Sequence, residues 1–190
     1  MKILLAVTGG IAAYKACLIV TKAIRQGHQV RVMMTESATK FVSPLTFSTL
    51  STQKVYTDTF ESGDVDHVQL AQWADVVVVA PATANTIAKI AHGIGDNFVT
   101  TTLLAVPNAT PILIAPAMNT AMWENLVTQA NIKKLRSYVR KEFLTGDSYL
   151  GGDPRFSFID PVEKRLACGV SGVGALASIN DIMSYIDGWG

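Results

Sequence analysis

The sequence predicts a single α/β domain built around a mostly parallel β-sheet, and three observations support this prediction. Three short runs, Ile3 to Val7, Val76 to Ala80 and Ile112 to Ala115, are apolar at every position, as is typical of strands covered by helices on both faces. Segments with helical spacing lie between these runs. The length, 190 residues without an internal repeat or linker, suits one domain covering 1–190. Strands and helices that alternate in this way predict right-handed crossovers.

The first helix is predicted to run from Ile11 to Gln26, directly after the first strand. Its broad apolar side, which we expect to face the sheet, comprises Ile11, Ala12, Tyr14, Ala16, Leu18, Ile19 and Ala23. Gly27 then ends the helix, in the position where a glycine is preferred. A second strand is predicted from Gln29 to Met34, followed by helical or loop residues.

A further helix is predicted from Thr83 to Ala91, closed by His92 and Gly93. Asp96 is expected to cap the next helix, Asn97 to Val106, because a side-chain carboxylate can accept a hydrogen bond from a free amide there.

The third apolar strand is expected to lead into one long helix from Thr120 to Val139. The residues that follow, 140–165, are rich in Gly, Asp and Pro. They predict a surface flap, or an ordered loop covering a site.

Charge and cysteine content exclude several classes of protein. The 16 Lys and Arg residues balance 15 Asp and Glu residues, a formal net charge of +1 without a basic run, so nucleic-acid binding is not expected. Two cysteines cannot form a disulfide framework, and no metal site is predicted. Met1 and Lys2 lead directly into a strand rather than a secretory signal, which favours a cytoplasmic protein.

Hydropathy predicts an additional buried surface rather than a membrane span. Hydrophobic residues make up 49% of the chain, charged residues only 16%, and the mean hydropathy is +0.29. The longest charge-free stretch, Asn97 to Trp123, is interrupted by Pro107, Pro111 and Pro116, so we do not expect it to cross a membrane. The apolar excess instead favours a subunit interface.

A glycine turn after the first strand is the first candidate binding element. In Thr8-Gly9-Gly10-Ile11, glycine lets the backbone approach a ligand, and the free amides at a helix start favour a phosphate. Thr35 rather than an acidic residue follows the second strand, so a mononucleotide is favoured over a dinucleotide. The alternative is a tight turn that needs glycine for its geometry alone.

Two side chains are candidates for proton transfer. His67 lies on one predicted helical face with Leu70 and Trp73, and histidine exchanges protons near neutral pH. Cys168 lies in a glycine-rich loop, where a thiol could donate a proton or act as a nucleophile. Taken alone, a single histidine is more often structural than catalytic.

The carboxyl ends of two predicted strands carry further candidates, because ligands of open α/β sheets bind at that edge. Small and polar residues at 81–86 suit either a flat polar heterocycle or a helix cap and subunit contact. After the other strand, Asn119 could present its amide to a carboxylate, between the apolar side chains of Met118 and Met122. Met and Trp at helical spacing are more often part of a packed core.

Together and in this order, these segments closely resemble the flavin-dependent cysteine decarboxylases, and within that family the coenzyme A branch. The matching positions include His67, the 81–86 segment, the Gly95-Asp96-Asn97 turn and the 116–123 segment, and the match spans nearly the whole chain. The resemblance implies a flavodoxin-like or Rossmann-like three-layer sandwich. It also implies homotrimers, some assembled further into dodecamers, with FMN at a subunit interface.

The resemblance also implies roles for individual residues. Its cofactor-binding positions correspond here to Thr8, Gly9, Gly10, Ile11, Thr35, Thr39, Ala82, Thr83, Asn85 and Thr86. In the family's reaction the substrate 4′-phosphopantothenoylcysteine loses hydride to FMN, and the resulting thioaldehyde is the electron sink for loss of CO₂. Reduction of the enethiol then gives 4′-phosphopantetheine. His67 would act as a base or position the substrate, Asn119 would hold its carboxylate, and Cys168 would donate the final proton, while Met118 and Met122 would line the substrate site.

Two departures from the family's pattern leave alternatives open. After Cys168 this chain has Gly174-Ala175-Leu176 where Gly-Arg-Met is usual, and the segment from Arg140 to Ser157 is longer. The alternatives are a decarboxylase of peptide C-terminal cysteines, a flavin prenyltransferase, a flavin-binding regulatory subunit and an electron carrier. The presence of Cys168 favours the coenzyme A branch, with the ligase that supplies the substrate expected on a separate chain.

Overall fold

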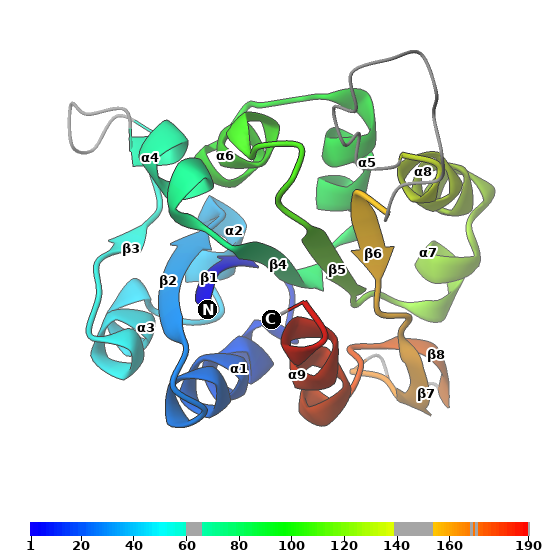
Figure 1. The fold of residues 1–190 in the computed structure, drawn as a ribbon. Coiled ribbons are helices and arrows are strands. Elements are labelled where there is room, and N and C mark those ends of the chain that lie inside the picture. The colour runs from blue at the N-terminus through cyan, green and yellow to red at the C-terminus, as the bar shows by residue number, and fades with distance from the viewer. Residues whose placement is uncertain (60–65, 139–153, 168, 170, 190) are drawn as a thin grey trace, which may run out of the picture.

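A six-stranded parallel sheet forms the centre of the molecule (Figure 1). The computed structural model describes residues 1–59, 66–138, 154–167, 169 and 171–189. The strands are β1 (Lys2–Val7), β2 (Gln29–Met34), β3 (Val55–Tyr56), β4 (Val76–Ala82), β5 (Ile112–Pro116) and β6 (Phe156–Phe158). All neighbouring pairs are parallel, in the order β3-β2-β1-β4-β5-β6. This is the order of a Rossmann-like doubly wound sheet, so the predicted fold class is confirmed.

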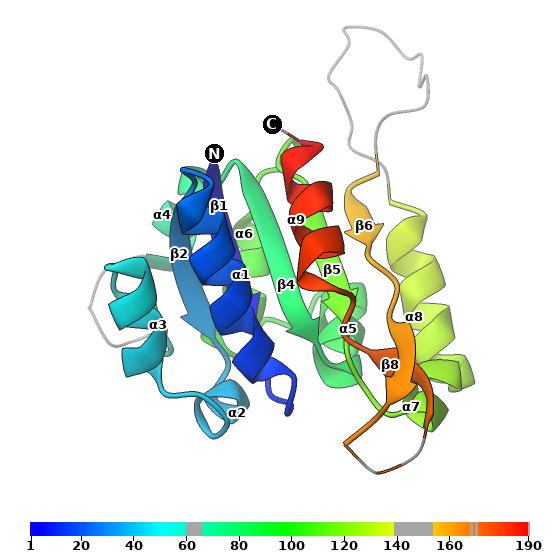
Figure 2. The ribbon, with the colours of Figure 1, turned by 90° about the horizontal axis from the view of Figure 1, so that it is seen from below.

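Helices cover both faces of the sheet and create a three-layer sandwich (Figure 1). One face is covered by α1 (Ala13–Arg25), α3 (Pro44–Ser51) and α9 (Ile179–Asp187). The other face is covered by α4 (Asp66–Trp73), α5 (Ala84–His92), α6 (Phe98–Ala105) and α8 (Leu126–Arg136). The short helices α2 (Glu36–Thr39) and α7 (Thr120–Glu124) lie at the edge to which the strands point (Figure 2). None of the described helices is both long and apolar enough to cross a membrane.

Successive side chains of the central strands alternate between the two cores. In β1, Leu5 packs in the core under α1, whereas Leu4 packs in the core under α4 and α6, and both are fully buried. In β4, Val78 and Val79 divide in the same way. Because a strand points successive side chains to opposite faces, a strand buried on both sides must be apolar throughout.

The buried face of α1 agrees with the predicted one at Ala16, Ile19 and Ala23 but not at its larger residues. Ile11, Tyr14 and Leu18 are 59%, 54% and 53% exposed, so the expectation that they face the sheet is wrong. The side chains that α1 buries are Ala13, Ala16, Ile19, Val20 and Ala23. Small alanine side chains let the helix backbone approach the sheet closely, so this row is preferred over the larger side chains beside it.

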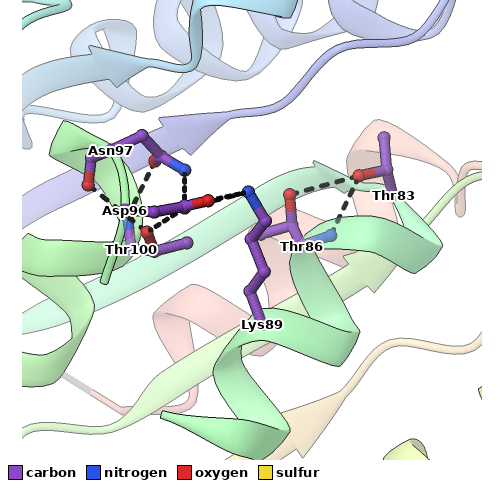
Figure 3. Close-up of polar contacts among 6 residues, drawn as sticks. All are labelled: Thr83, Thr86, Lys89, Asp96, Asn97 and Thr100. Carbon is purple, nitrogen blue, oxygen red and sulfur yellow. Dashed lines mark hydrogen bonds and ion pairs between the residues drawn. The ribbon is translucent and has the colours of Figure 1, made fainter. Parts of the chain in front are cut away.

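Two helix boundaries also differ from the predictions. The expected long helix over 120–139 is divided into α7 and α8 at Asn125, whose side-chain oxygen accepts a 2.9 Å hydrogen bond from the Val127 amide and caps α8. Asp96 does not cap α6, because Asn97 accepts the bond from the Thr100 amide instead. In Figure 3, Asp96 contacts the Lys89 ammonium at 2.6 Å, and this hydrogen bond lowers the pKa of the Asp96 carboxyl.

The predicted flap over 140–165 is only partly described, since 139–153 lie outside the described residues. Its described part is regular structure rather than loop. It contributes β6 to the central sheet and β7 (Val162–Arg165), which pairs antiparallel with β8 (Ser171–Ala175) to form a two-stranded ribbon. The short, partly polar β6 lacks the fully apolar pattern from which the other strands were predicted, because it lies at the sheet edge.

Arg155, directly before β6, fastens this edge to the end of α6. Its side chain is buried, and its guanidinium donates hydrogen bonds to the carbonyl oxygens of Val106, at 2.9 Å, Pro107, at 2.6 Å, and Thr110. The buried charge therefore satisfies carbonyls that follow the helix and have no partner within it.

We expect Arg155→Met to lower the free energy of unfolding by about 3 kcal/mol, because buried carbonyls would lose charged donors. Urea denaturation measures this change. Arg136→Met is the control, since Arg136 forms an exposed pair with Asp160, and such pairs contribute about 1 kcal/mol or less. Equal destabilisation by the two variants would contradict the anchoring role of Arg155.

Candidate active site

A cavity of about 600 Å³ lies where the carboxyl ends of β1, β4 and β5 meet the two-stranded ribbon. Its lining comprises Gly9, Gly10, Ile11, Ala12, Tyr14, Lys15, Pro81, Thr83, Ala84, Ala117, Met118, Asn119, Met122, Arg165, Leu166, Ala167, Gly174, Ala175 and Leu176. The volume is in the range of small-molecule and cofactor sites, and the position is the usual ligand edge of an open α/β sheet.

The glycine turn after β1 forms one wall of this cavity. A Cβ atom on Gly9 would lie 2.3 Å from the Cβ of Ser37, so only glycine allows the turn to pack against α2. A Cβ atom on Gly10 would meet nothing closer than a Thr83 methyl at 3.9 Å, so the turn is open on its cavity side. The structure thus brings Gly9, Gly10 and Ile11, three of the predicted cofactor contacts, to the cavity.

Thr8 has a different place from its neighbours in the turn. It is fully buried, and its hydroxyl donates to the Pro81 carbonyl at 2.6 Å and accepts from the Thr83 amide at 3.0 Å. Thr8 therefore joins the ends of β1 and β4, and its side chain is absent from the cavity lining.

The threonines near α5 and α2 act mainly as helix caps. Thr83 lines the cavity, and its hydroxyl caps α5 by accepting from the Thr86 amide at 3.2 Å (Figure 3). Thr35 caps α2 in the same way, and the Thr39 hydroxyl donates to the Glu36 carbonyl at 2.7 Å. The predicted cofactor contacts that do not line this cavity are Thr8, Thr35, Thr39, Ala82, Asn85 and Thr86.

Asn119 stands at the opposite wall, at the turn that follows β5. Its side-chain oxygen accepts a 2.8 Å hydrogen bond from the Ala121 amide and so caps α7. Met118 and Met122 line the same cavity as Asn119. The turn after β5 therefore brings one side-chain amide and two apolar side chains to the same cavity.

The two-stranded ribbon completes the cavity and is fixed by backbone contacts. The Met118 amide donates to the Gly174 carbonyl at 2.9 Å. Gly174 has φ +151°, and a Cβ atom there would lie 2.2 Å from the Met118 carbonyl oxygen. Beside it, Gly172 packs directly against Thr120, whose buried hydroxyl has no hydrogen-bond partner among the described residues. Cys168 lies outside the described residues. Arg165, three positions before it in the sequence, lines the cavity.

His67 is not brought to this cavity. It lies in the first turn of α4, on the other face of the sheet from α1, and is absent from the cavity lining. Its Nδ1 atom is buried and has no hydrogen-bond partner in the part of the chain that the structure describes. Within one chain, His67 and Asn119 therefore do not share a site.

Two cations in the cavity wall, Lys15 and Arg165, were missed by the sequence analysis. Burial lowers the pKa of the Lys15 ammonium, and the nearby Lys164 lowers it further. Lys15 follows the glycine turn closely in the sequence, and Arg165 precedes Cys168 by three positions. This proximity to predicted site segments could have identified both cations from the sequence. No acidic side chain belongs to the described lining of the cavity, so its wall is positively charged.

A Rossmann-like sheet, an open glycine turn and a cavity of this size define a protein that binds a nucleotide-like cofactor. The chain belongs to the Flavoprotein family, whose model matches residues 1–190.

Curated relatives cover almost all of this chain. The bifunctional coenzyme A biosynthesis protein CoaBC of Bacillus subtilis is 46% identical over 188 residues, which are 97% of this chain but 42% of that protein. The chain thus spans about two fifths of that relative's length. A probable phosphopantothenoylcysteine decarboxylase of Streptococcus mutans is 42% identical over 189 residues, covering 98% of this chain and 97% of that protein.

Solved structures agree over the same span. A cysteine-to-serine mutant of a PPC decarboxylase, complexed with pantothenoylaminoethenethiol, is 32% identical, with a TM-score of 0.78, covering 98% of this chain and 96% of that chain. The FMN-binding protein AtHal3 is 33% identical, with a TM-score of 0.79, covering 98% of this chain and 94% of that chain.

Proposed function

We propose that this chain is an FMN-dependent decarboxylase that converts 4′-phosphopantothenoylcysteine to 4′-phosphopantetheine in coenzyme A biosynthesis. The observation that carries the proposal is the cavity between the glycine turn and Asn119, which suits a cofactor at one wall and a carboxylate at the other. The similarity to decarboxylases over nearly the full chain supports the same reaction.

The residues present fit FMN. The turn at Gly9 and Gly10 is open toward the cavity, so its amides can hold a phosphate at the start of α1. Pro81, Ala117 and Met118 supply the apolar wall that a flat ring system needs. When bound, FMN supplies two-electron redox chemistry, which the protein's own side chains cannot provide.

The chain's own residues bind and orient the substrate. The Asn119 amide holds the substrate carboxylate by donating a hydrogen bond, and Met118 and Met122 exclude water beside it. The substrate would give two electrons to bound FMN before CO₂ is lost, so that an enethiol would remain. Cys168 would then donate the proton required when that enethiol is reduced by the electrons returned from the flavin. His67 acts as a base or positions the substrate.

The separation of His67 from the cavity supports a site shared between copies of this chain. If both His67 and Asn119 contact the substrate, a second copy must bring the imidazole to the cavity. The half-exposed row Ile11, Tyr14 and Leu18, which begins at the cavity, is a suitable apolar contact for that copy. A homotrimer is the state we propose, and a dodecamer built from such trimers is the alternative.

The experiment is an anaerobic incubation of the flavin-loaded protein with 4′-phosphopantothenoylcysteine, following flavin absorbance and product mass together. A product lighter by CO₂ alone, with oxidised flavin at the end, supports the proposal. A product lighter by CO₂ and two hydrogens, with bleached flavin, would favour the peptide-cysteine alternative. An unchanged substrate would favour the regulatory or prenyl-transfer alternatives.

We expect Cys168→Ser to retain CO₂ release but to accumulate the enethiol, because a serine hydroxyl is a much weaker acid than a thiol. Mass spectrometry of the product distinguishes the two compounds. The control is Cys17→Ser: Cys17 lies in α1, half buried, and burial raises the pKa of its thiol. Complete turnover by the Cys168→Ser variant would remove the proton-donor role.

A further inference from the structure

Lys15 and Arg165 reach the cavity from opposite parts of the chain. Lys15 lies in the first turns of α1, and Arg165 is the last residue of β7. Neither side chain forms an ion pair with an acidic residue in the described part of the chain. Glu163, the acidic residue of β7, is exposed and does not line the cavity.

The two cations line the same cavity, one from α1 and the other from β7. Lys164, the neighbour of Arg165 on β7, acts on the ammonium of Lys15, so α1 and the ribbon bring positive charges close together. Like charges held together without a carboxylate repel one another, and the arrangement gains free energy when an anion binds between them. Lys15 is also half buried, which strengthens its interaction with a bound anion.

The position of Arg165 indicates which anion is bound. In the ribbon register Arg165 pairs with Ser171, and Cys168 lies between these two residues in the sequence. Because the proposed function assigns Cys168 to the substrate, we assign a cation three positions before it in the sequence to the substrate as well. The amides of the glycine turn already provide for the cofactor's phosphate at Gly9 and Gly10.

We propose that Lys15 and Arg165 together bind the phosphate monoester of the substrate and make the enzyme selective for phosphorylated over unphosphorylated substrates. This inference rests on the proposed function. Arginine offers a planar pair of donors to phosphate oxygens and lysine a compact charge, and the two suit a dianion. A peptide ending in cysteine has no such group, so these cations also discriminate against the peptide alternative.

The test compares 4′-phosphopantothenoylcysteine with its dephosphorylated form in Lys15→Met and Arg165→Gln variants. We expect kcat/KM for the phosphorylated substrate to fall about 10- to 100-fold in each variant, because each loses a charged hydrogen bond. The value for the dephosphorylated substrate should change less than about threefold by the same reasoning. Lys15→Arg should restore most of the preference, and Lys22→Met, on the same helix but bonded to Asn180, should leave it unchanged.

A binding measurement separates this inference from the proposed function. Calorimetry on the flavin-loaded variants should show weaker binding of 4′-phosphopantetheine with unchanged binding of pantetheine. If the wild type turns over neither substrate but shows this pattern, the phosphate site stands and the decarboxylase proposal falls. If the variants instead lose FMN, the cations bind the cofactor's phosphate, and the inference is overturned. Equal loss for both substrates would also overturn it.

Discussion

Replacing Asn119 by Asp is expected to abolish turnover while leaving the fold and the FMN content intact. Aspartate caps a helix as well as asparagine does, so its oxygen can still accept from the Ala121 amide and start α7. The substitution removes the amide donor from the cavity and places a negative charge beside the substrate carboxylate. Repulsion of two charges about 4 Å apart in partly buried surroundings costs roughly 4 kcal/mol, or about a thousandfold in kcat/KM.

Steady-state kinetics on the flavin-loaded protein measure this loss, and Asn119→Ser provides the matched control. Serine also caps helices well and carries no charge, so it replaces the amide donor by a shorter hydroxyl without adding repulsion. We expect it to lose about 10- to 100-fold, clearly less than the aspartate variant. Turnover of the aspartate variant at more than about a tenth of the wild-type rate, against the thousandfold loss expected, would show that Asn119 does not hold the carboxylate.

Gly174→Ala should detach the two-stranded ribbon from the cavity. A methyl group there would lie 2.2 Å from the Met118 carbonyl oxygen, a backbone atom that cannot rotate away, and the φ of +151° is itself unfavourable for alanine. The 2.9 Å hydrogen bond from the Met118 amide would be lost as the ribbon moves. We expect an activity loss of about a hundredfold or more, since overpacking and backbone strain each cost about 1–3 kcal/mol.

Limited proteolysis, with kinetics, measures this effect by reporting cleavage in the ribbon. Gly169→Ala is the control, because Gly169 also has a positive φ, +86°, but a Cβ atom there would meet no atom within 4 Å. The Gly169→Ala variant therefore has the backbone strain of an alanine at positive φ but no steric clash with a neighbouring atom. If the two variants behave alike, the contact between Gly174 and Met118 does not hold the ribbon in place.

The central architecture and the segments around the cavity could be predicted from the order of residues alone. Val76 to Ala80 is apolar throughout because β4 is buried on both faces, and this pattern is visible without any structure. Glycine after β1 and polar residues after β5 mark the ligand edge for a similar reason, since parallel strands end together. Gly9, Gly10 and Asn119 were found in this way, and all three line the cavity.

Only the packing of the folded chain decided which face of a helix is buried against the sheet and which distant side chains come together. Ile11, Tyr14 and Leu18 have the spacing of a buried face, yet the alanines beside them pack more closely on the sheet. Lys15 and Arg165 are 150 positions apart in the sequence, and no local pattern links them. They share a cavity because the contact of Gly174 with Met118 fixes the ribbon. Such long-range contacts depend on how the side chains and backbone of the folded chain fit together, and the spacing of residues in the sequence does not encode that fit.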